Sequence, residues 1–229
     1  MSIADHIARL RAEIDSAAGQ SGRAGADITL VAATKTQCAD SVRAAVAAGV
    51  DACGENRVQE LTEKLDAGAY SGAPLHFIGH LQKNKVRKVV GAVDLIQSVD
   101  TLPLLETIDR VAGELQLVQD VLIQVNIGAD AAKFGLDEST LMQFLDGAAA
   151  LSHIRVRGLM TMLPLEANRA ETRALFARMY QVFVDIKTKK TYDTIDMDVL
   201  SMGMSGDFYD AILEGANMIR VGSTIFGNR

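Results

Sequence analysis

The chain has 229 residues, a formal net charge of −6, and a composition of 48% hydrophobic and 23% charged residues. Such a composition excludes a disordered chain, and the net negative charge argues against a large nucleic-acid-binding surface. No segment reaches the roughly 20 apolar residues that span a bilayer, and the first residues do not resemble a secretory leader. We therefore expect a cytoplasmic protein without membrane contact, folded as one domain over residues 1–229.

The two cysteines, Cys38 and Cys53, have neither a metal-ligand spacing nor a disulfide-rich context. They predict a reducing compartment and no metal site.

In chain order, an amphipathic helical pattern over residues 1–15 is followed by short apolar runs that alternate with helical patterns. Several of the runs are rich in Val, Ile and Leu without polar alternation, which is typical of strands buried on both faces. The expected strands are 28–33, 51–53, 75–78, 93–98, 120–126, 154–159, 198–201 and 218–221. The expected helices after the first are 41–48, 56–65, 102–115, 141–150 and 170–187.

Eight strands that alternate with helices indicate an α/β protein with parallel strands. A doubly wound sheet is the alternative, but its glycine-rich first turn is missing, because the first strand ends in Thr34-Lys35-Thr36-Gln37. We therefore predict a single (β/α)8 TIM barrel with an extra N-terminal helix. Only residues 222–229 follow the last strand, so we expect the N-terminal helix to cover part of the missing final helix.

Small and hydroxyl-bearing residues follow the last two expected strands, at residues 201–207 and 220–224. In TIM barrels phosphate is often held after strands seven and eight, where backbone N–H groups and helix starts favour anions. Each segment alone fits an ordinary tight turn equally well. Their pairing favours a phosphate site.

Lys35 follows the first expected strand, which barrel closure places beside the eighth. Apolar walls and a second cation, Arg220, favour the unprotonated amine that a Schiff base needs. A lone lysine after a strand is usually only solvated, but a lysine beside a phosphate site requires an aldehyde that also carries phosphate. Pyridoxal 5′-phosphate (PLP) is such a molecule. A Schiff-base aldolase that acts on a sugar phosphate remains an alternative.

Further polar residues follow the second and third expected strands. Asn56 fits either a hydrogen bond to a ring hydroxyl or the N-cap of the next helix. His80 is expected to face the barrel mouth, whereas His76 within the strand fits a packed core residue equally well. The basic residues in 83–88 are interpreted as a solvated face, with weak anion binding as the alternative.

Five short motifs occur in order along the chain, as Ala33-Thr34-Lys35-Thr36, Gly54-Glu55-Asn56, His76-Phe77-Ile78-Gly79, Leu200-Ser201-Met202-Gly203-Met204-Ser205 and Arg220-Val221-Gly222. Together they resemble the YggS/PROSC family of PLP homeostasis proteins. The resemblance runs from about residue 28 to the C-terminus, and it implies a barrel like the N-terminal domain of alanine racemase (fold type III PLP).

The resemblance also implies roles for individual residues. PLP would be bound to Lys35 as a Schiff base, its phosphate would be held by Ser205, Gly222 and Ser223, Arg220 would face the pyridine nitrogen, and Asn56 would approach the ring substituents. Further candidates for contact with the cofactor are His80, Met204, Thr224 and Lys133. Lys133 lies in a block, residues 131–135, that resembles a family block usually containing Lys-Ser-Gly, although a solvated loop lysine is the simpler interpretation.

Two departures concern the lysine motif. Thr34 stands where family members often have serine, which keeps a hydroxyl, and no proline follows the lysine. The shape of this turn is therefore not predicted.

The function that the resemblance implies is to carry or buffer PLP, in support of vitamin B6 and of amino-acid and keto-acid homeostasis, without a dedicated reaction. PLP and PLP-dependent apo-enzymes are the expected partners, and the chain is expected to be a monomer. The alternative is a weak PLP-dependent amino-acid racemase. Alanine racemase takes its second acid/base group, a tyrosine, from another domain of a partner subunit, and in this sequence only Tyr209 is expected near the phosphate site.

Overall fold

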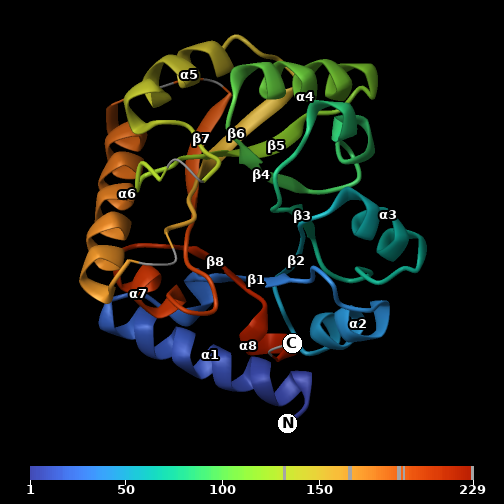
Figure 1. Cartoon of the computed structure of the whole chain (residues 1–229), viewed down its shortest axis with the longest axis vertical. Coiled ribbons are helices and arrows are strands. Elements are labelled where there is room, and N and C mark those ends of the chain that lie inside the picture. The colour runs from blue at the N-terminus through green and yellow to red at the C-terminus, as the bar shows by residue number, and fades with distance from the viewer. Residues whose placement is uncertain (131–132, 165–166, 190–191, 193, 228–229) are drawn as a thin grey trace.

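Eight parallel strands close into a barrel in the computed structural model of the chain, with each strand beside its sequence neighbours and β1 beside β8 (Figure 1). The structure describes residues 1–130, 133–164, 167–189, 192 and 194–227. The strands are β1 Thr29–Ala33, β2 Ala52–Glu55, β3 Leu75–Phe77, β4 Leu95–Val99, β5 Gln119–Gln124, β6 Ile154–Met160, β7 Ile195–Ser201 and β8 Met218–Val221. The predicted TIM barrel is confirmed.

Helices surround the barrel (Figure 1). They are α1 Ile3–Gln20, α2 Ala39–Ala47, α3 Val58–Asp66, α4 Leu102–Glu114, α5 Leu141–Ala148, α6 Arg169–Lys189, α7 Phe208–Leu213 and α8 Ser223–Phe226. Short 3-10 helices span Gly25–Asp27, Lys83–Lys88 and Glu138–Thr140. No helix within the described ranges combines the length and the apolar character that a membrane crossing requires.

The largest difference from the predicted strand boundaries is in β7, which begins at Ile195 rather than at residue 198. Asp196 and Asp198 are exposed, so the first half of this strand does not have the apolar pattern of a strand buried on both faces.

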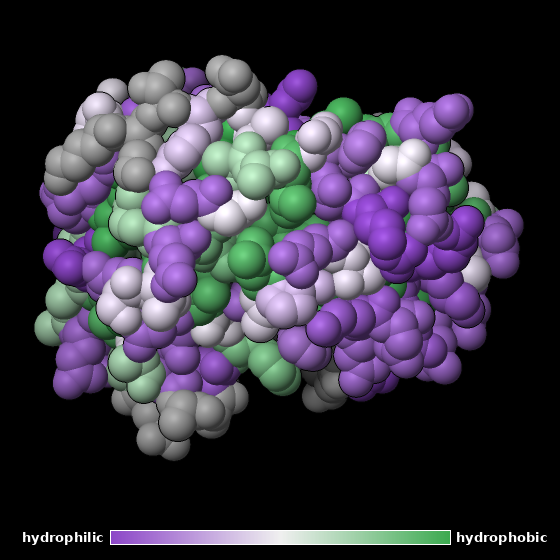
Figure 2. Space-filling view, turned by 90° about the horizontal axis from the view of Figure 1, so that it is seen from above, coloured by the Kyte–Doolittle hydropathy of each residue, from purple (hydrophilic) through white to green (hydrophobic). Residues whose placement is uncertain are grey.

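Viewed from the side of α4 and α5, the surface is mixed, with apolar residues exposed between hydrophilic ones (Figure 2).

The N-terminal helix α1 packs where a full eighth helix would lie. It begins with a capping box, in which the Asp5 backbone N–H donates to Ser2 Oγ at 3.1 Å and the Ser2 N–H donates to Asp5 Oδ2 at 2.8 Å. Ile7, Leu10 and Ile14 on its inner face are fully buried, and the helix contacts α7 and the four-residue α8 (Figure 1). The expected cover for the missing helix is confirmed.

Two apolar layers build the core. Alternate residues of the strands, among them Val31, Leu122 and Met218, fill the barrel interior, while their neighbours Leu30 and Ala32 pack against the helices. Because side chains alternate along a strand, Arg220 follows Met218 on the inner face of β8. The same alternation brings polar side chains to the carboxyl end of the barrel interior.

Gly158 lies where the pairing of β6 with β7 shifts register, and its φ is 147°. A Cβ atom there would lie 1.9 Å from the Val199 carbonyl oxygen. We therefore expect Gly158→Ala to lower the free energy of unfolding by at least about 2 kcal/mol in a urea titration. Gly19→Ala is the matched control, because no atom lies within 4 Å of its Cβ position in α1, and it should raise stability by up to about 1 kcal/mol. Equal stabilities for the two variants would contradict this account of Gly158.

Candidate functional site

A cavity of about 490 Å³ lies at the carboxyl ends of β1, β7 and β8. Its volume is within the range of about 300–1,000 Å³ that is usual for small-molecule sites. Its walls come from three segments, and they comprise Ala33, Lys35, Thr36, Gln37, Met204, Ser205, Gly206, Arg220, Gly222, Ser223, Phe226 and Gly227. The structure thus brings the Lys35 amine, the Arg220 cation and the two small-residue loops into one cavity.

Strand register places Lys35 beside these loops. Val31 of β1 pairs with Arg220 of β8, and Ala33 pairs with Gly54 of β2. Lys35 lies two residues beyond Ala33, so it rises above the rim between β8 and β2. Thr36 next to it has a φ of 62°, a left-handed conformation that is uncommon for a threonine.

Thr34, where the sequence departs from the family pattern, is fully buried. Its hydroxyl lies 3.1 Å from the Gly54 carbonyl oxygen and 3.2 Å from Glu55 Oε2. The hydroxyl therefore ties β1 to β2 below the rim.

Arg220 is a buried cation. It is only 4% exposed, and its guanidinium donates to Ser201 Oγ at 2.6 Å and to the Thr161 carbonyl oxygen at 2.8 Å. Desolvation lowers the pKa of Arg220 to about 10, although the carboxylate of Asp207 acts in the opposite direction. The group stays protonated at neutral pH. Among the described residues it forms no ion pair, so the cavity offers a positive charge to a ligand.

Behind Arg220, a chain of hydrogen bonds crosses the barrel interior. Ser201 Oγ donates to Gln97 Oε1 at 2.7 Å, which leaves the Gln97 amide nitrogen 2.9 Å from His76 Nδ1. That ring nitrogen therefore accepts, and the proton of the neutral imidazole resides on Nε2. His76 is 6% exposed, so it is a packed core residue, and its ring takes part in this chain of hydrogen bonds.

The loop between β7 and α7 carries Ser205. The Gly222 backbone N–H donates to Ser205 Oγ at 3.1 Å, which joins this loop to the one after β8. Asp207 Oδ1 accepts from the Met204 N–H at 2.6 Å, and burial raises the pKa of Asp207. No atom lies within 4 Å of a Cβ position on Gly206, so the loop faces open space there.

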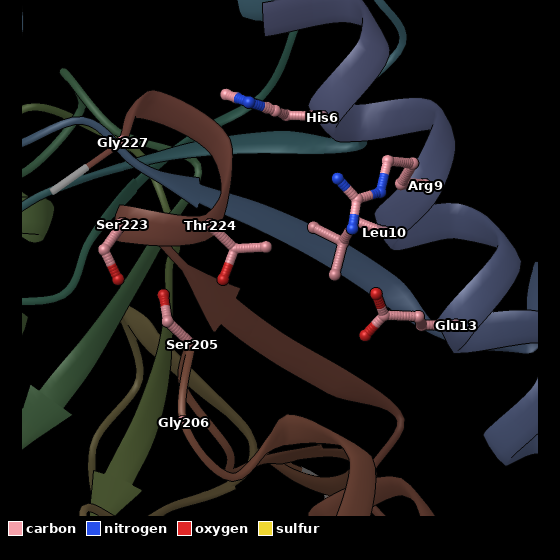
Figure 3. A pocket seen from close by; sticks show the side chains of 9 residues that line it. All are labelled: His6, Arg9, Leu10, Glu13, Ser205, Gly206, Ser223, Thr224 and Gly227. Atoms are coloured by element: carbon pink, nitrogen blue, oxygen red, sulfur yellow. The ribbon is translucent and has the colours of Figure 1, made fainter. Parts of the chain in front are cut away.

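A second cavity, of about 460 Å³, lies on the outer side of these two loops, between them and α1 (Figure 3). It shares Ser205, Gly206, Ser223 and Gly227 with the lysine cavity. Figure 3 shows the Ser205 and Ser223 hydroxyls facing each other, with Arg9 and Glu13 of α1 directed toward the loops. Thr224 lines this outer cavity and not the lysine cavity.

Asn56 lies directly after β2 and is not the N-cap of α3, because that position belongs to Arg57. The Asn56 N–H donates to Glu55 Oε1 at 2.8 Å. Its side-chain Oδ1 is buried and has no hydrogen-bond partner among the described residues. A buried acceptor without a partner is costly, and a ligand that donates a hydrogen bond would remove the cost.

Other sequence candidates lie elsewhere on the barrel. His80 stacks on Phe134 with 3.8 Å between ring centroids and lines a separate pocket with Lys83 and Asp100. Lys133 lies in the loop after β5 and does not line the lysine cavity, and residues 131 and 132 of the same motif lie outside the described residues. The basic segment 83–88 forms a 3-10 helix in which Arg87 pairs with Glu114.

The model of the alanine racemase N-terminal domain family matches residues 6–229. The PLP homeostasis protein of Aquifex aeolicus is 35% identical over 229 residues, which cover 100% of this chain and 99% of that protein. The chain belongs to the PLP homeostasis protein family. The relative from Pseudomonas aeruginosa is 37% identical over 230 residues, which cover 100% of this chain and 96% of that protein. The YggS/PROSC resemblance is confirmed.

Solved structures agree with this family membership. PipY of Synechococcus elongatus without PLP is 36% identical and superposes with a TM-score of 0.88, covering 99% of this chain and 100% of that chain. The same protein with PLP bound gives a TM-score of 0.86 with the same coverage. An alanine racemase of Clostridium difficile shares the fold at 17% identity and a TM-score of 0.72, over 89% of this chain and 56% of that chain.

The burial of His76 in this hydrogen-bond chain predicts that the protein loses stability in acid. Desolvation lowers the pKa of His76 from about 6.5 to about 4. Below about pH 6.5 the unfolded chain binds a proton at this histidine, whereas the folded chain does not. The free energy of unfolding therefore falls as the pH drops below about 6.5. On acidification to about pH 4, this group should cost as much as about 3 kcal/mol of unfolding free energy.

The measurement is urea unfolding at several pH values between about 7 and 4. His76→Gln lacks the titrating group, so its stability should fall less steeply over this range than that of the unsubstituted chain. Equal slopes would show that His76 takes up its proton in the folded chain.

Proposed function

We propose that this chain binds PLP in the lysine cavity and carries or buffers it, in support of vitamin B6 and of amino-acid and keto-acid homeostasis. The observation that carries the proposal is the cavity that joins the Lys35 amine to Arg220 and to the loops of Ser205 and Ser223. PLP homeostasis proteins at 35–37% identity over the full chain, and the PLP-bound structure of PipY, support it.

The residues present fit the functional groups of PLP. When bound, PLP supplies an aldehyde that condenses with a primary amine, with loss of one water molecule. Lys35 is the amine that lines the cavity. The hydroxyls of Ser205 and Ser223 supply hydrogen-bond donors for the phosphate, and Met204 lines the wall beside them. The Gly222 N–H donates to Ser205 Oγ in this structure, so it would have to exchange that bond for one to the phosphate.

Arg220 and Asn56 fit the ring. Arg220 lines the cavity and is the candidate partner of the pyridine nitrogen. Asn56 does not line the cavity, but it follows the neighbouring strand β2, and its buried Oδ1, without a partner in the described chain, suits a ring hydroxyl. A fixed cation disfavours protonation of the ring nitrogen, so Arg220 would keep the ring a weak electron sink. This property suits a protein that holds the cofactor rather than one that drives a reaction with it.

The position of Tyr209 favours a carrier over a racemase. Gln20 donates to the Tyr209 hydroxyl at 2.6 Å, and Ser16 Oγ lies 3.1 Å from it, so the ring is directed toward α1. Of the residues that the structure describes, no tyrosine lines the lysine cavity. A racemase needs a second acid/base group opposite the lysine, and Tyr209 does not supply it here.

The whole chain, residues 1–229, acts as one PLP-binding domain and as a monomer in the cytoplasm. It delivers PLP to PLP-dependent apo-enzymes. His80, Thr224 and Lys133 remain candidates for contact with PLP only outside the lysine cavity, because none of them lines it.

Lys35→Ala tests the binding site. Borohydride treatment of the PLP-loaded unsubstituted chain should label the peptide that contains Lys35, and the variant should lose that label. Because Arg220, Ser205 and Ser223 remain, the variant should still bind PLP without the covalent bond. Lys187→Ala, at an exposed position on α6, is the matched control and should keep the label. A label that persists in Lys35→Ala would place the bond elsewhere, and a colourless unsubstituted chain that ignores PLP would favour the aldolase alternative.

Transfer of PLP to an apo-enzyme tests the carrier function. The loaded chain should restore activity to a PLP-dependent apo-enzyme at least as fast as an equal amount of free PLP, while a PLP-trapping reagent stops only the free cofactor. Loss of transfer in the presence of the trap would argue against a carrier. Turnover of D- and L-amino acids by the loaded chain would favour the racemase alternative.

A further inference from the structure

A cluster of buried charges lies beneath the lysine cavity, between β1, β2 and α3. Glu55 is fully buried and Lys64 is 7% exposed. Lys64 Nζ lies 2.6 Å from Glu55 Oε2 and 3.2 Å from Glu60 Oε2, and the Tyr70 hydroxyl donates to Glu55 Oε2 at 3.2 Å. Burying charges is expensive, and an apolar core at this place would often be as stable. The cluster therefore calls for an explanation other than stability.

Each charged member of the cluster also binds backbone at the edge of the site. Lys64 Nζ donates to the Thr34 carbonyl oxygen at 2.7 Å, and the Thr36 N–H donates to Glu60 Oε2 at 2.6 Å. These two bonds hold the residues on either side of Lys35. On the other strand, Glu55 Oε1 accepts from the Asn56 N–H at 2.8 Å.

The bond from Glu60 holds a strained residue. Thr36 has a φ of 62°, and the left-handed conformation is unfavourable for a residue with a branched Cβ. Such a conformation persists only where its surroundings determine it, and a carboxylate that accepts from the N–H at 2.6 Å does so here. The Thr36 hydroxyl also donates to the Lys35 carbonyl oxygen at 2.6 Å, and the Gln37 N–H donates to the Thr34 carbonyl oxygen at 3.1 Å, so the turn has bonds of its own. Loss of the Glu60 bond would remove an anchor of this turn to α3 and leave the backbone that carries Lys35 less constrained.

We infer that Glu55, Glu60 and Lys64 form a positioning cluster that sets the backbone around Lys35, the amine of the cavity, and at Asn56, the candidate partner of the ring hydroxyl. The inference rests on the proposed function, since Lys35 must be the residue that binds PLP covalently. The bonds from the charged members to the segments of Lys35 and Asn56 go to backbone atoms. One charged unit thereby positions the amine that follows β1 and the amide that follows β2 together.

Glu60 is the residue to substitute. Lys64→Met would leave Glu55 buried without its cation and would endanger the fold. The Glu60 side chain is 19% exposed and lies at the edge of the cluster, so Glu60→Ala should fold. Glu60→Gln is the conservative partner, because its amide oxygen can still accept from the Thr36 N–H.

The first measurement needs no PLP. In the PLP-free chain, amide hydrogen exchange at Thr36 should speed up in Glu60→Ala and stay near its original rate in Glu60→Gln. Unchanged exchange at Thr36 in Glu60→Ala would overturn the inference whatever the chain binds.

The second measurement is the rate constant for covalent attachment of PLP to Lys35, followed by borohydride trapping and peptide mapping. We expect Glu60→Ala to slow attachment by about tenfold, the penalty expected if the left-handed turn is no longer held, and Glu60→Gln to stay within about twofold. Attachment in Glu60→Ala at the original rate, or equal loss in both variants, would overturn the positioning role.

Asp120→Asn is the matched control. It removes a 2.9 Å ion pair with Arg157 near the start of β5, at the opposite end of the barrel. This variant should lower the melting temperature without slowing attachment at Lys35, and slower attachment there would show that the rate reports general stability only. If the unsubstituted chain itself forms no bond at Lys35, the proposed function fails, whereas the exchange result at Thr36 stands by itself.

Discussion

The pairing of β1 with β8 is the constraint on which the site depends. This pairing brings Lys35, near the start of the sequence, next to Ser205, Arg220 and Ser223, near its end. The register Val31 to Arg220 sets how far the amine rises above the buried cation. A slip of one residue would turn every side chain of β1 to its opposite face. The packing of Val31 inside the barrel and of Leu30 and Ala32 against the helices therefore fixes the chemistry as well as the core.

Two buried polar systems support this rim from different sides. The chain from Arg220 through Ser201 and Gln97 to His76 holds a cation inside the barrel, and no carboxylate of the described residues forms an ion pair with it. The cluster around Lys64 and Glu55 holds backbone instead. The first system leaves a positive charge for a ligand. The second leaves none, because the Lys64 ammonium pairs with both Glu55 and Glu60, and Glu60 also pairs with Arg57 at 3.5 Å.

Much of the fold could be predicted from the sequence, because parallel strands that are buried on both faces appear in it as continuous apolar runs. The positions of Lys35 and Ser205 could also be predicted, since residues that follow parallel strands lie at the carboxyl end of the barrel. Arg220 lies within β8, near the same end. The polar chains were not, because Gln97 sits in an apolar run and the partners of Glu55 come from α3. Spacing left Asn56 open as a helix cap, whereas Arg57 holds that position. The direction of Tyr209 depends on its contact with α1, which comes from the opposite end of the sequence.

The wall between the lysine cavity and the outer cavity is one layer of residues thick at Ser205 and Ser223. A serine hydroxyl has a single proton to donate, and Ser205 already receives one from the Gly222 N–H. If an anion in the lysine cavity accepts the Ser205 hydroxyl proton, Ser205 can offer only a lone pair to the outer cavity. The two compartments therefore compete for the same donors, and this makes their occupancy mutually exclusive for any pair of anions that both require them.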